Sequence, residues 1–209
     1  MNDRASLDTR ARAFFEDLWR RGDPWELETS EFERQRHDHL VATLHGRSYG
    51  RVLEIGCGAG AFTRRLATIA SDIVAVDVSA SAIERARATM PVRRVDFRVA
   101  NVMDFDVTAE GSWDLVVMTE TIYYLGWLYP FFDVAWLASQ LYLATARGGR
   151  LLLSNTAGGC DDYLLLPPII RTYRDLFVNV GFTVAGEPTF RGVKDGVALE
   201  VLTSLFEKP

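Results

Sequence analysis

The stretch "LEIGCGAGAFT", from Leu53 to Thr63, places glycines at three alternate positions, Gly56, Gly58 and Gly60, directly after a short apolar run. Glycines between a strand and a helix let the backbone approach a ligand closely, because no side chain stands in the way. The spacing is GxGxG, whereas a dinucleotide site carries GxGxxG, and no Walker-type lysine follows. The loop therefore predicts a ligand other than a dinucleotide.

An acidic residue supports a ribose-containing ligand. Asp77 ends the next apolar run, "IVAVD", about twenty residues beyond the glycines, where a carboxylate can accept both hydroxyls of a ribose. A lone glycine motif also occurs in turns of unrelated α/β proteins. Asp77 makes the ligand-binding interpretation the stronger one.

The apolar runs "RVLEIG", "DIVAVD", "VDFRVA", "WDLVVMT" and "GRLLLSN" are separated by segments of helical character. Strands that alternate with helices predict a parallel sheet with helices on both faces. Gly148 and Gly149 predict a helix cap and turn before the fifth strand. The last residues alternate like two strands and predict an antiparallel pair at one edge. We therefore expect an α/β, Rossmann-like, seven-stranded, mostly parallel sheet with an antiparallel edge strand.

Residues 1–47 differ from the remainder of the chain, since they combine many charges with scattered aromatic residues. This pattern favours amphipathic helices that lie on a larger body. We predict an N-terminal helical lid or extension over 1–47 and a ligand-binding domain over 48–209.

Composition limits the class of partner and the compartment. The 209 residues carry a formal charge of −5 and no dense Lys/Arg block, which argues against a nucleic-acid partner and favours a small molecule. Two cysteines without a CxxC pair fit a reduced, cytoplasmic setting. The first residues lack the apolar region of a signal peptide, and no apolar run is long enough to span a membrane, so no membrane partner is expected.

The ordered segments "VLEIGCGAG", "VAVD", "VANVMDF", "WDLVVMTETIYYL" and "GGRLLLSN" resemble the successive motifs of class I S-adenosylmethionine-dependent methyltransferases. They cover about half of the chain, from Val52 to Asn155. The opening segment "DPWELETSEFERQRHDHL", together with "ETIYYL", is similar to the nodulation protein S group, a family of N-methyltransferases that act on the free amine of a chitooligosaccharide. The resemblance implies S-adenosyl-L-methionine as the cofactor.

The same resemblance assigns cofactor contacts at the glycine loop. The methionine end would lie over the backbone from Gly56 to Gly60, including Cys57 and Gly58. Glu54 would sit beneath the loop and orient it, and Asp77 would hold the ribose.

The resemblance also assigns the adenine contacts. Asn101 stands where many relatives carry an Asp that accepts a hydrogen bond from the adenine amine, and Asp104 is a rival for this role. Val78 and Val102 would flank the adenine plane, although both could be plain core valines.

The segment "TETIYYLGW" is expected at the carboxyl end of the fourth strand, where open α/β sheets bind ligands. Thr119 is expected beside the cofactor. Glu120 is the leading candidate for an acceptor-side catalytic carboxylate, and its alternative role is to cap the short helix that follows. Tyr123 is a further catalytic candidate, but Tyr123 and Tyr124 would point to different faces of a helix, so we expect one of them in the pocket.

The N-terminal segment supplies further candidates. His37 or His39 could serve as a base, although both could be surface residues whose spacing does not suit a metal site. Trp25 could cover the cofactor, and Arg34 and Arg36 offer a guanidinium for its carboxylate. An amphipathic helix with solvated arginines would explain the same residues.

The segment after the fifth strand offers acidic side chains to an acceptor. Asp161 and Asp162 could bind its hydroxyls or amine, or could be turn residues.

These observations predict a methyltransferase for a small-molecule acceptor, with the nitrogen of an amino sugar or a related metabolite preferred. An O- or S-methyltransferase is the alternative with the same cofactor. A non-catalytic nucleotide-binding protein is a third reading.

Overall fold

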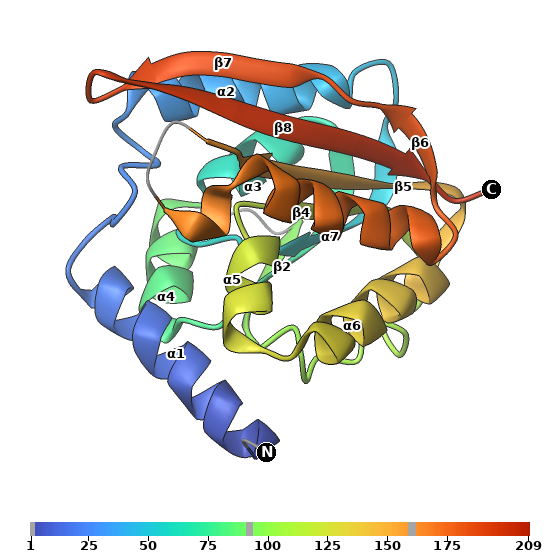
Figure 1. Cartoon of the computed structure of the whole chain (residues 1–209), viewed down its shortest axis with the longest axis horizontal. Coiled ribbons are helices and arrows are strands. Elements are labelled where there is room, and N and C mark those ends of the chain that lie inside the picture. Colours follow the sequence, from blue (N-terminus) through green and yellow to red (C-terminus); the bar gives the residue numbers. More distant parts are fainter. Residues whose placement is uncertain (1–2, 91–93, 159–161) are drawn as a thin grey trace.

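The computed structural model describes residues 3–90, 94–158 and 162–209. At its centre is an eight-stranded sheet with the order β3-β2-β1-β4-β5-β8-β6, in which β7 also pairs with β8 (Figure 1). The strands are β1 (Tyr49–Ile55), β2 (Ala70–Asp77), β3 (Val95–Val99), β4 (Trp113–Thr119), β5 (Thr145–Thr156), β6 (Thr183–Gly186), β7 (Thr189–Lys194) and β8 (Val197–Glu207).

Strands β1 to β5 pair in parallel, and β8 pairs with β5 in the antiparallel direction. The predicted fold class is therefore confirmed, with one strand more than the seven expected. The extra strand arises because β8 is long enough to hold two partners along one edge. Its last residues pair with β6 and its first residues pair with β7.

Helices cover both faces of the sheet because its central strands bury side chains on both sides. Leu53, Ile55 and Val116 belong to one core, whereas Val52 and Leu115 belong to the other, as the two-residue period of a strand requires. The first core includes residues of α1 (Arg4–Arg20), α5 (Ile122–Leu128), α6 (Phe131–Ala144) and α7 (Pro167–Asn179). The second includes residues of α2 (Glu31–Thr43), α3 (Ala61–Leu66) and α4 (Ala80–Thr89).

Two local features concern the glycines before the fifth parallel strand and the start of α4. The predicted turn at "ARGGR" lies within β5, where Gly148 has φ 68° and the pairing with β4 shifts register between Trp113 and Leu115. The glycines thus lie at a β-bulge, and the strand continues through it. Ser79 caps α4, because its hydroxyl accepts a hydrogen bond from the Ala82 amide at 3.2 Å.

The N-terminal residues form α1 and α2, joined by the turns of residues 21–30. In Figure 1, α1 lies beside α4 at the lower left and α2 runs behind β7 and β8. Glu16 fastens α1 to the start of α4. It accepts hydrogen bonds from the Ser79 hydroxyl at 2.8 Å and from the Ser81 hydroxyl at 2.6 Å.

Candidate active site

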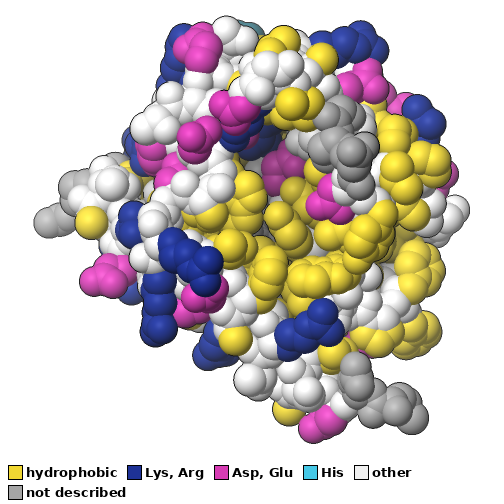
Figure 2. All heavy atoms as spheres, turned by 60° about the vertical axis from the view of Figure 1, so that its left-hand side comes forward, with side chains coloured by type: hydrophobic (Ala, Val, Ile, Leu, Met, Phe, Trp, Pro, Cys, Tyr) yellow, Lys and Arg dark blue, Asp and Glu magenta, His cyan; other side chains and the backbone are white. Residues whose placement is uncertain are grey.

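A cavity of about 420 Å³ opens at the carboxyl ends of β1, β2 and β4. The strand order reverses between β1 and β4, and this switch point is where open α/β sheets bind ligands. On the face shown in Figure 2, hydrophobic side chains surround a hollow with acidic side chains inside it. Both N-terminal helices contribute to the wall, through Phe15 and Trp19 of α1 and Arg36 of α2.

The glycine loop forms one side of this cavity. Gly56 and Gly58 have φ angles of 76° and 53°, which favour glycine, and both line the cavity with Cys57. A Cβ at Gly58 would lie 2.6 Å from a ring atom of Trp19, so this glycine admits the indole of α1. Gly60 is outside the cavity lining. A Cβ there would press on Phe97 at 3.2 Å, which makes it a packing glycine rather than a ligand contact.

Asp77 is fixed by backbone donors at the end of β2. Its two carboxylate oxygens accept hydrogen bonds from the amides of Gly58 and Ser79, both at 2.9 Å. Burial raises the pKa of Asp77, and these hydrogen bonds oppose the rise. The carboxylate therefore faces the cavity in one orientation with lone pairs to spare.

Glu54 lies buried beneath the glycine loop. Its Oε2 atom has no hydrogen-bond partner in the described part of the chain. Burial, with a smaller contribution from the charge of Asp77, raises the pKa of Glu54 to about 8. An unpartnered buried oxygen is costly, so this atom is suited to a donor brought by a ligand.

The other end of the cavity is lined by Val78, Asn101 and Val102. Asn101 is buried, whereas the side chain of its rival, Asp104, is 54% exposed and lies 3.6 Å from Arg4. Of the two candidates, Asn101 is the one that reaches the cavity.

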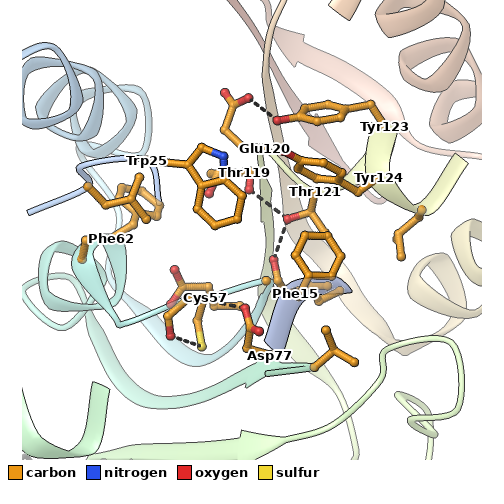
Figure 3. Close-up of a pocket in the computed structure, with 18 of the residues that line it drawn as sticks. Phe15, Trp25, Cys57, Phe62, Asp77, Thr119, Glu120, Thr121, Tyr123 and Tyr124 are labelled. Atoms are coloured by element: carbon orange, nitrogen blue, oxygen red, sulfur yellow. Dashed lines mark hydrogen bonds between the residues drawn. The ribbon is translucent and has the colours of Figure 1, made fainter. Parts of the chain in front are cut away.

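Glu120 stands in the cavity wall where β4 meets α5 (Figure 3). Its backbone has φ 52°, an uncommon conformation for a residue with a side chain. The carboxylate accepts hydrogen bonds from the Tyr123 hydroxyl at 3.0 Å and from the Thr156 amide at 2.9 Å. Burial raises the pKa of Glu120, and the nearby Arg36 guanidinium opposes the rise. These contacts fix a carboxylate at the surface of the cavity, instead of placing it as a helix cap.

Arg36 is buried and joins two carboxylates. Its guanidinium lies 2.7 Å from Glu33 and 3.5 Å from Glu120, and Lys194 of β7 lies 3.1 Å from Glu33. Two positive and two negative side chains thus form one charge-balanced group that links α2, β7 and β4. Arg34, two residues earlier on the helix, points to solvent and pairs with Glu31 at 2.9 Å. The prediction for Arg34 is therefore corrected, because the helical turn places Arg36 at the cavity instead.

His37 lines the cavity, but its surroundings disfavour a role as a base. Burial, aided by the charge of Arg36, lowers its pKa to about 3. The Nε2 atom of His37 lies 3.3 Å from the Arg36 guanidinium. Because arginine only donates, Nε2 must accept, which leaves no free ring lone pair on the neutral histidine.

Tyr123 and Tyr124 both line the cavity, contrary to the expectation that one would turn away. Their rings pack against each other at 4.5 Å, so the short helix presents both toward the same space. Burial raises the pKa of Tyr123 well above its usual value. Tyr123 is thus a protonated donor that positions Glu120 rather than a base.

Aromatic rings form the remaining wall. Trp25 lies 5.7 Å from Trp19 and 6.3 Å from Tyr124 between ring centroids, and Phe15 lies 5.1 Å from Tyr124. Figure 3 shows Trp25, Phe15 and Tyr124 around the space in front of Glu120. The cavity therefore combines one fixed carboxylate with several aromatic faces.

The structure brings most predicted site residues to this cavity and leaves Arg34, His39, Gly60 and Asp104 outside it. The predicted residues that line it are Trp25, His37, Glu54, Gly56, Cys57, Gly58, Asp77, Val78, Asn101, Val102, Thr119, Glu120 and Tyr123. Asp162 also lines the cavity, and Asp161 lies outside the described residues.

Sequence reasoning missed Glu33, Thr156 and Lys194. The spacing of Glu33 and Arg36, three residues apart on one helix, could have indicated their pairing. No local signal marks Lys194, which reaches the cavity from a strand far along the chain.

The described residues hold neither a metal-binding cluster nor a membrane-spanning helix. No group of three or more His, Cys, Asp or Glu side chains is arranged there to hold a metal ion. Within the same ranges, no helix combines the length and apolarity that crossing a bilayer demands.

Comparison with known proteins agrees with this architecture. A crystal structure of N-methyltransferase NodS from Bradyrhizobium japonicum WM9, in complex with S-adenosyl-L-homocysteine, aligns with a TM-score of 0.78 at 24% identity, over 95% of this chain and 98% of that chain. Magnesium protoporphyrin IX methyltransferase from Synechocystis PCC 6803 aligns with a TM-score of 0.64 at 20% identity, over 98% and 99% of the two chains. The fold is that of the class I S-adenosylmethionine-dependent methyltransferases.

Sequence comparison defines the family within this class. The family model of nodulation protein S (NodS) matches residues 11–128. Nodulation protein S of Rhizobium tropici is 34% identical over 135 residues, which are 64% of this chain and 55% of that protein. The chain belongs to the nodulation protein S family, as its motifs predicted. It spans about half the length of the curated relatives that it matches.

Proposed function

We propose that the protein transfers the methyl group of S-adenosylmethionine to the nitrogen of a small polar amine, and that an amino sugar is the preferred acceptor. The observation that carries this proposal is Glu120, a carboxylate fixed in the cavity wall beside aromatic rings. Membership of the nodulation protein S family supports the reaction, since the compared NodS structure is of an N-methyltransferase.

The cavity suits the cofactor in its donors and acceptors. In this proposal, the methionine part lies over Gly56 and Gly58, the ribose at Asp77 and the adenine between Val78 and Val102. The prearranged Asp77 carboxylate fits two ribose hydroxyls. The unpartnered Oε2 atom of Glu54 fits the ammonium group of the methionine part, directly or through water.

S-adenosylmethionine supplies a methyl group that its sulfonium charge already activates, so the chain mainly aligns the acceptor and excludes water. Trp25 and Tyr124 offer aromatic faces that can stack on a pyranose and attract an ammonium. Glu120 can hold that ammonium and accept its proton before transfer.

The state of His37 weighs against a hydroxyl acceptor. A hydroxyl usually needs a base to remove its proton, whereas a neutral amine needs little activation. His37 has a lowered pKa, and its Nε2 atom is occupied by Arg36. Transfer to oxygen or sulfur is the alternative, and the choice of acceptor distinguishes it from transfer to nitrogen.

The Glu120→Gln variant tests the proposal, because it keeps the shape of the side chain and removes the charge. We expect transfer from labelled cofactor to an amino-sugar amine to fall about 100-fold or more if proton transfer limits the rate. Affinity for S-adenosylhomocysteine should stay nearly unchanged.

The matched control is Glu84→Gln, since Glu84 is exposed on α4 and lies outside the cavity lining. It should leave transfer unchanged. The proposal fails if the wild type methylates only hydroxyl acceptors, or if Glu120→Gln acts on amines as fast as the wild type.

A further inference from the structure

Asn101 differs from an aspartate at its position in one respect that matters for recognition. Both oxygens of a carboxylate accept hydrogen bonds, whereas an amide can present either an oxygen or an NH₂ group. The exocyclic amine of adenine is a donor and needs an acceptor. An asparagine serves adenine here only if its amide is held with the oxygen available.

The neighbours of Asn101 determine this orientation. Its Nδ2 atom donates to Asp8 Oδ1 at 2.9 Å and to the Tyr129 hydroxyl at 2.8 Å. Its Oδ1 atom accepts a hydrogen bond from the Met103 amide at 3.1 Å. An ionised carboxylate cannot donate and a backbone N–H cannot accept, so the reversed amide would face two mismatches.

Asp8 is the strongest of these constraints, and it comes from α1. The Tyr129 hydroxyl donates to the same Oδ1 atom at 2.8 Å, which closes a triangle of Asp8, Asn101 and Tyr129. Tyr129 alone would not fix the amide, because a hydroxyl can donate or accept. With both hydrogens of Asn101 engaged, its oxygen keeps one lone pair beyond the Met103 contact.

We infer that Asp8 is a specificity-determining positioning residue, which holds the Asn101 amide so that its oxygen recognises the exocyclic amine of adenine. This inference rests on the placement of adenosine proposed above. It makes α1 part of cofactor recognition. Asn101 and Tyr129 line the adenine end of the cavity, and the anchor Glu16 lies near the ribose residue Asp77. Glu16 follows Asp8 by eight positions on α1, which is about 12 Å along the helix.

The test compares two ligands by calorimetry. One is S-adenosylhomocysteine, and the other is S-inosylhomocysteine, which carries a carbonyl oxygen in place of the exocyclic amine. The wild type should bind the adenosyl ligand about tenfold or more tightly than the inosyl ligand. In Asp8→Asn, the amide at 101 can reverse, so this preference should fall toward one.

A paired exchange separates positioning from a purely structural role. In the double variant Asp8→Asn with Asn101→Asp, the residue at 101 only accepts and the residue at 8 supplies the NH₂ group, so the preference should return. Glu16→Gln is the control, because it loosens α1 away from the adenine and should weaken both ligands equally. The double variant decides the question if Asp8→Asn alone does not fold.

The inference is overturned if the wild type shows no preference, if folded Asp8→Asn keeps it, or if the folded double variant lacks it. If the wild type binds neither ligand, the proposed cofactor itself is wrong. The two failures are therefore distinguishable.

Discussion

At the scale of single residues, similar carboxylates acquire different properties from their surroundings. Hydrogen bonds from Ser81 and Ser79 lower the pKa of Glu16 to about 2, whereas burial raises the pKa of Glu54 to about 8. Burial also raises the pKa of Glu120, and the Arg36 guanidinium opposes the rise. Position in the fold, not residue type, thus decides the direction in which the pKa of each carboxylate shifts.

The raised pKa of Glu54 predicts a specific pH dependence of stability. Between about pH 4.5 and pH 8, the folded state keeps the proton of Glu54 while the unfolded state releases it, so unfolding becomes easier as pH rises. Glu54→Gln removes this effect. The variant should therefore gain stability relative to the wild type as pH rises across that window, by at most about 5 kcal/mol in the free energy of unfolding.

Urea unfolding at several pH values in the absence of cofactor measures this difference. Parallel stability curves for the two proteins would show that Glu54 titrates normally in the folded state.

Several site residues could be predicted from the sequence because local motifs mark them. Glu54, Gly56, Gly58 and Asp77 belong to short segments whose spacing reflects a strand, a loop and the next strand. Lys194 and Asp8 could not be predicted in this way, because their partners Glu33 and Asn101 lie far along the chain. The choice between Arg34 and Arg36 could not be made from the sequence, because the phase of the helix against the sheet depends on packing, which the polar pattern leaves open.

At the scale of elements, α1 and the segment after it differ in how they are held. Glu16 and Asp8 attach α1 at two points by polar contacts. Residues 21–30 form turns, and Trp25 rests on other aromatic rings at the cavity. Lys194 donates a hydrogen bond to the Trp25 carbonyl at 2.6 Å. A lid that closes over the cofactor is therefore proposed for residues 23–36 rather than for α1.

Hydrogen exchange tests this division. Addition of S-adenosylhomocysteine should slow amide exchange in residues 23–36, because the ligand completes the burial of Trp25, which is half-buried without it. Amides in the middle of α6, which contributes no cavity residue, serve as the internal control. Equal exchange in residues 23–36 with and without ligand would indicate a permanently packed extension.

The succession of strands and helices, the parallel pairing and the antiparallel end were all predictable, since buried strands and amphipathic helices leave periodic patterns. The split of the last segment into β6, β7 and β8 was not. Whether one long strand pairs with one partner or two depends on tertiary pairing, and the alternating pattern is the same in both cases.

At the scale of the whole molecule, the sheet, the N-terminal helices and β7 meet around one cavity with two distinct ends. In the proposed function, one end offers Asp77, Asn101 and flanking valines to an adenosine. In the same proposal, the other end offers Glu120 and aromatic faces to an acceptor, and Glu120 forms a charge-balanced group with Arg36, Glu33 and Lys194. This arrangement supports the central claim that a methyl group passes from cofactor to amine between the two ends.

The most direct test of that claim locates the transferred methyl group. The protein is incubated with S-adenosylmethionine that carries a trideuteromethyl group, and with either a chitooligosaccharide that has one free amine or its fully N-acetylated counterpart. Mass spectrometry and NMR of the products should find the label on nitrogen, and only in the oligosaccharide with the free amine. Label on oxygen in either acceptor, or no transfer to the free amine by protein that binds the cofactor, would contradict the account.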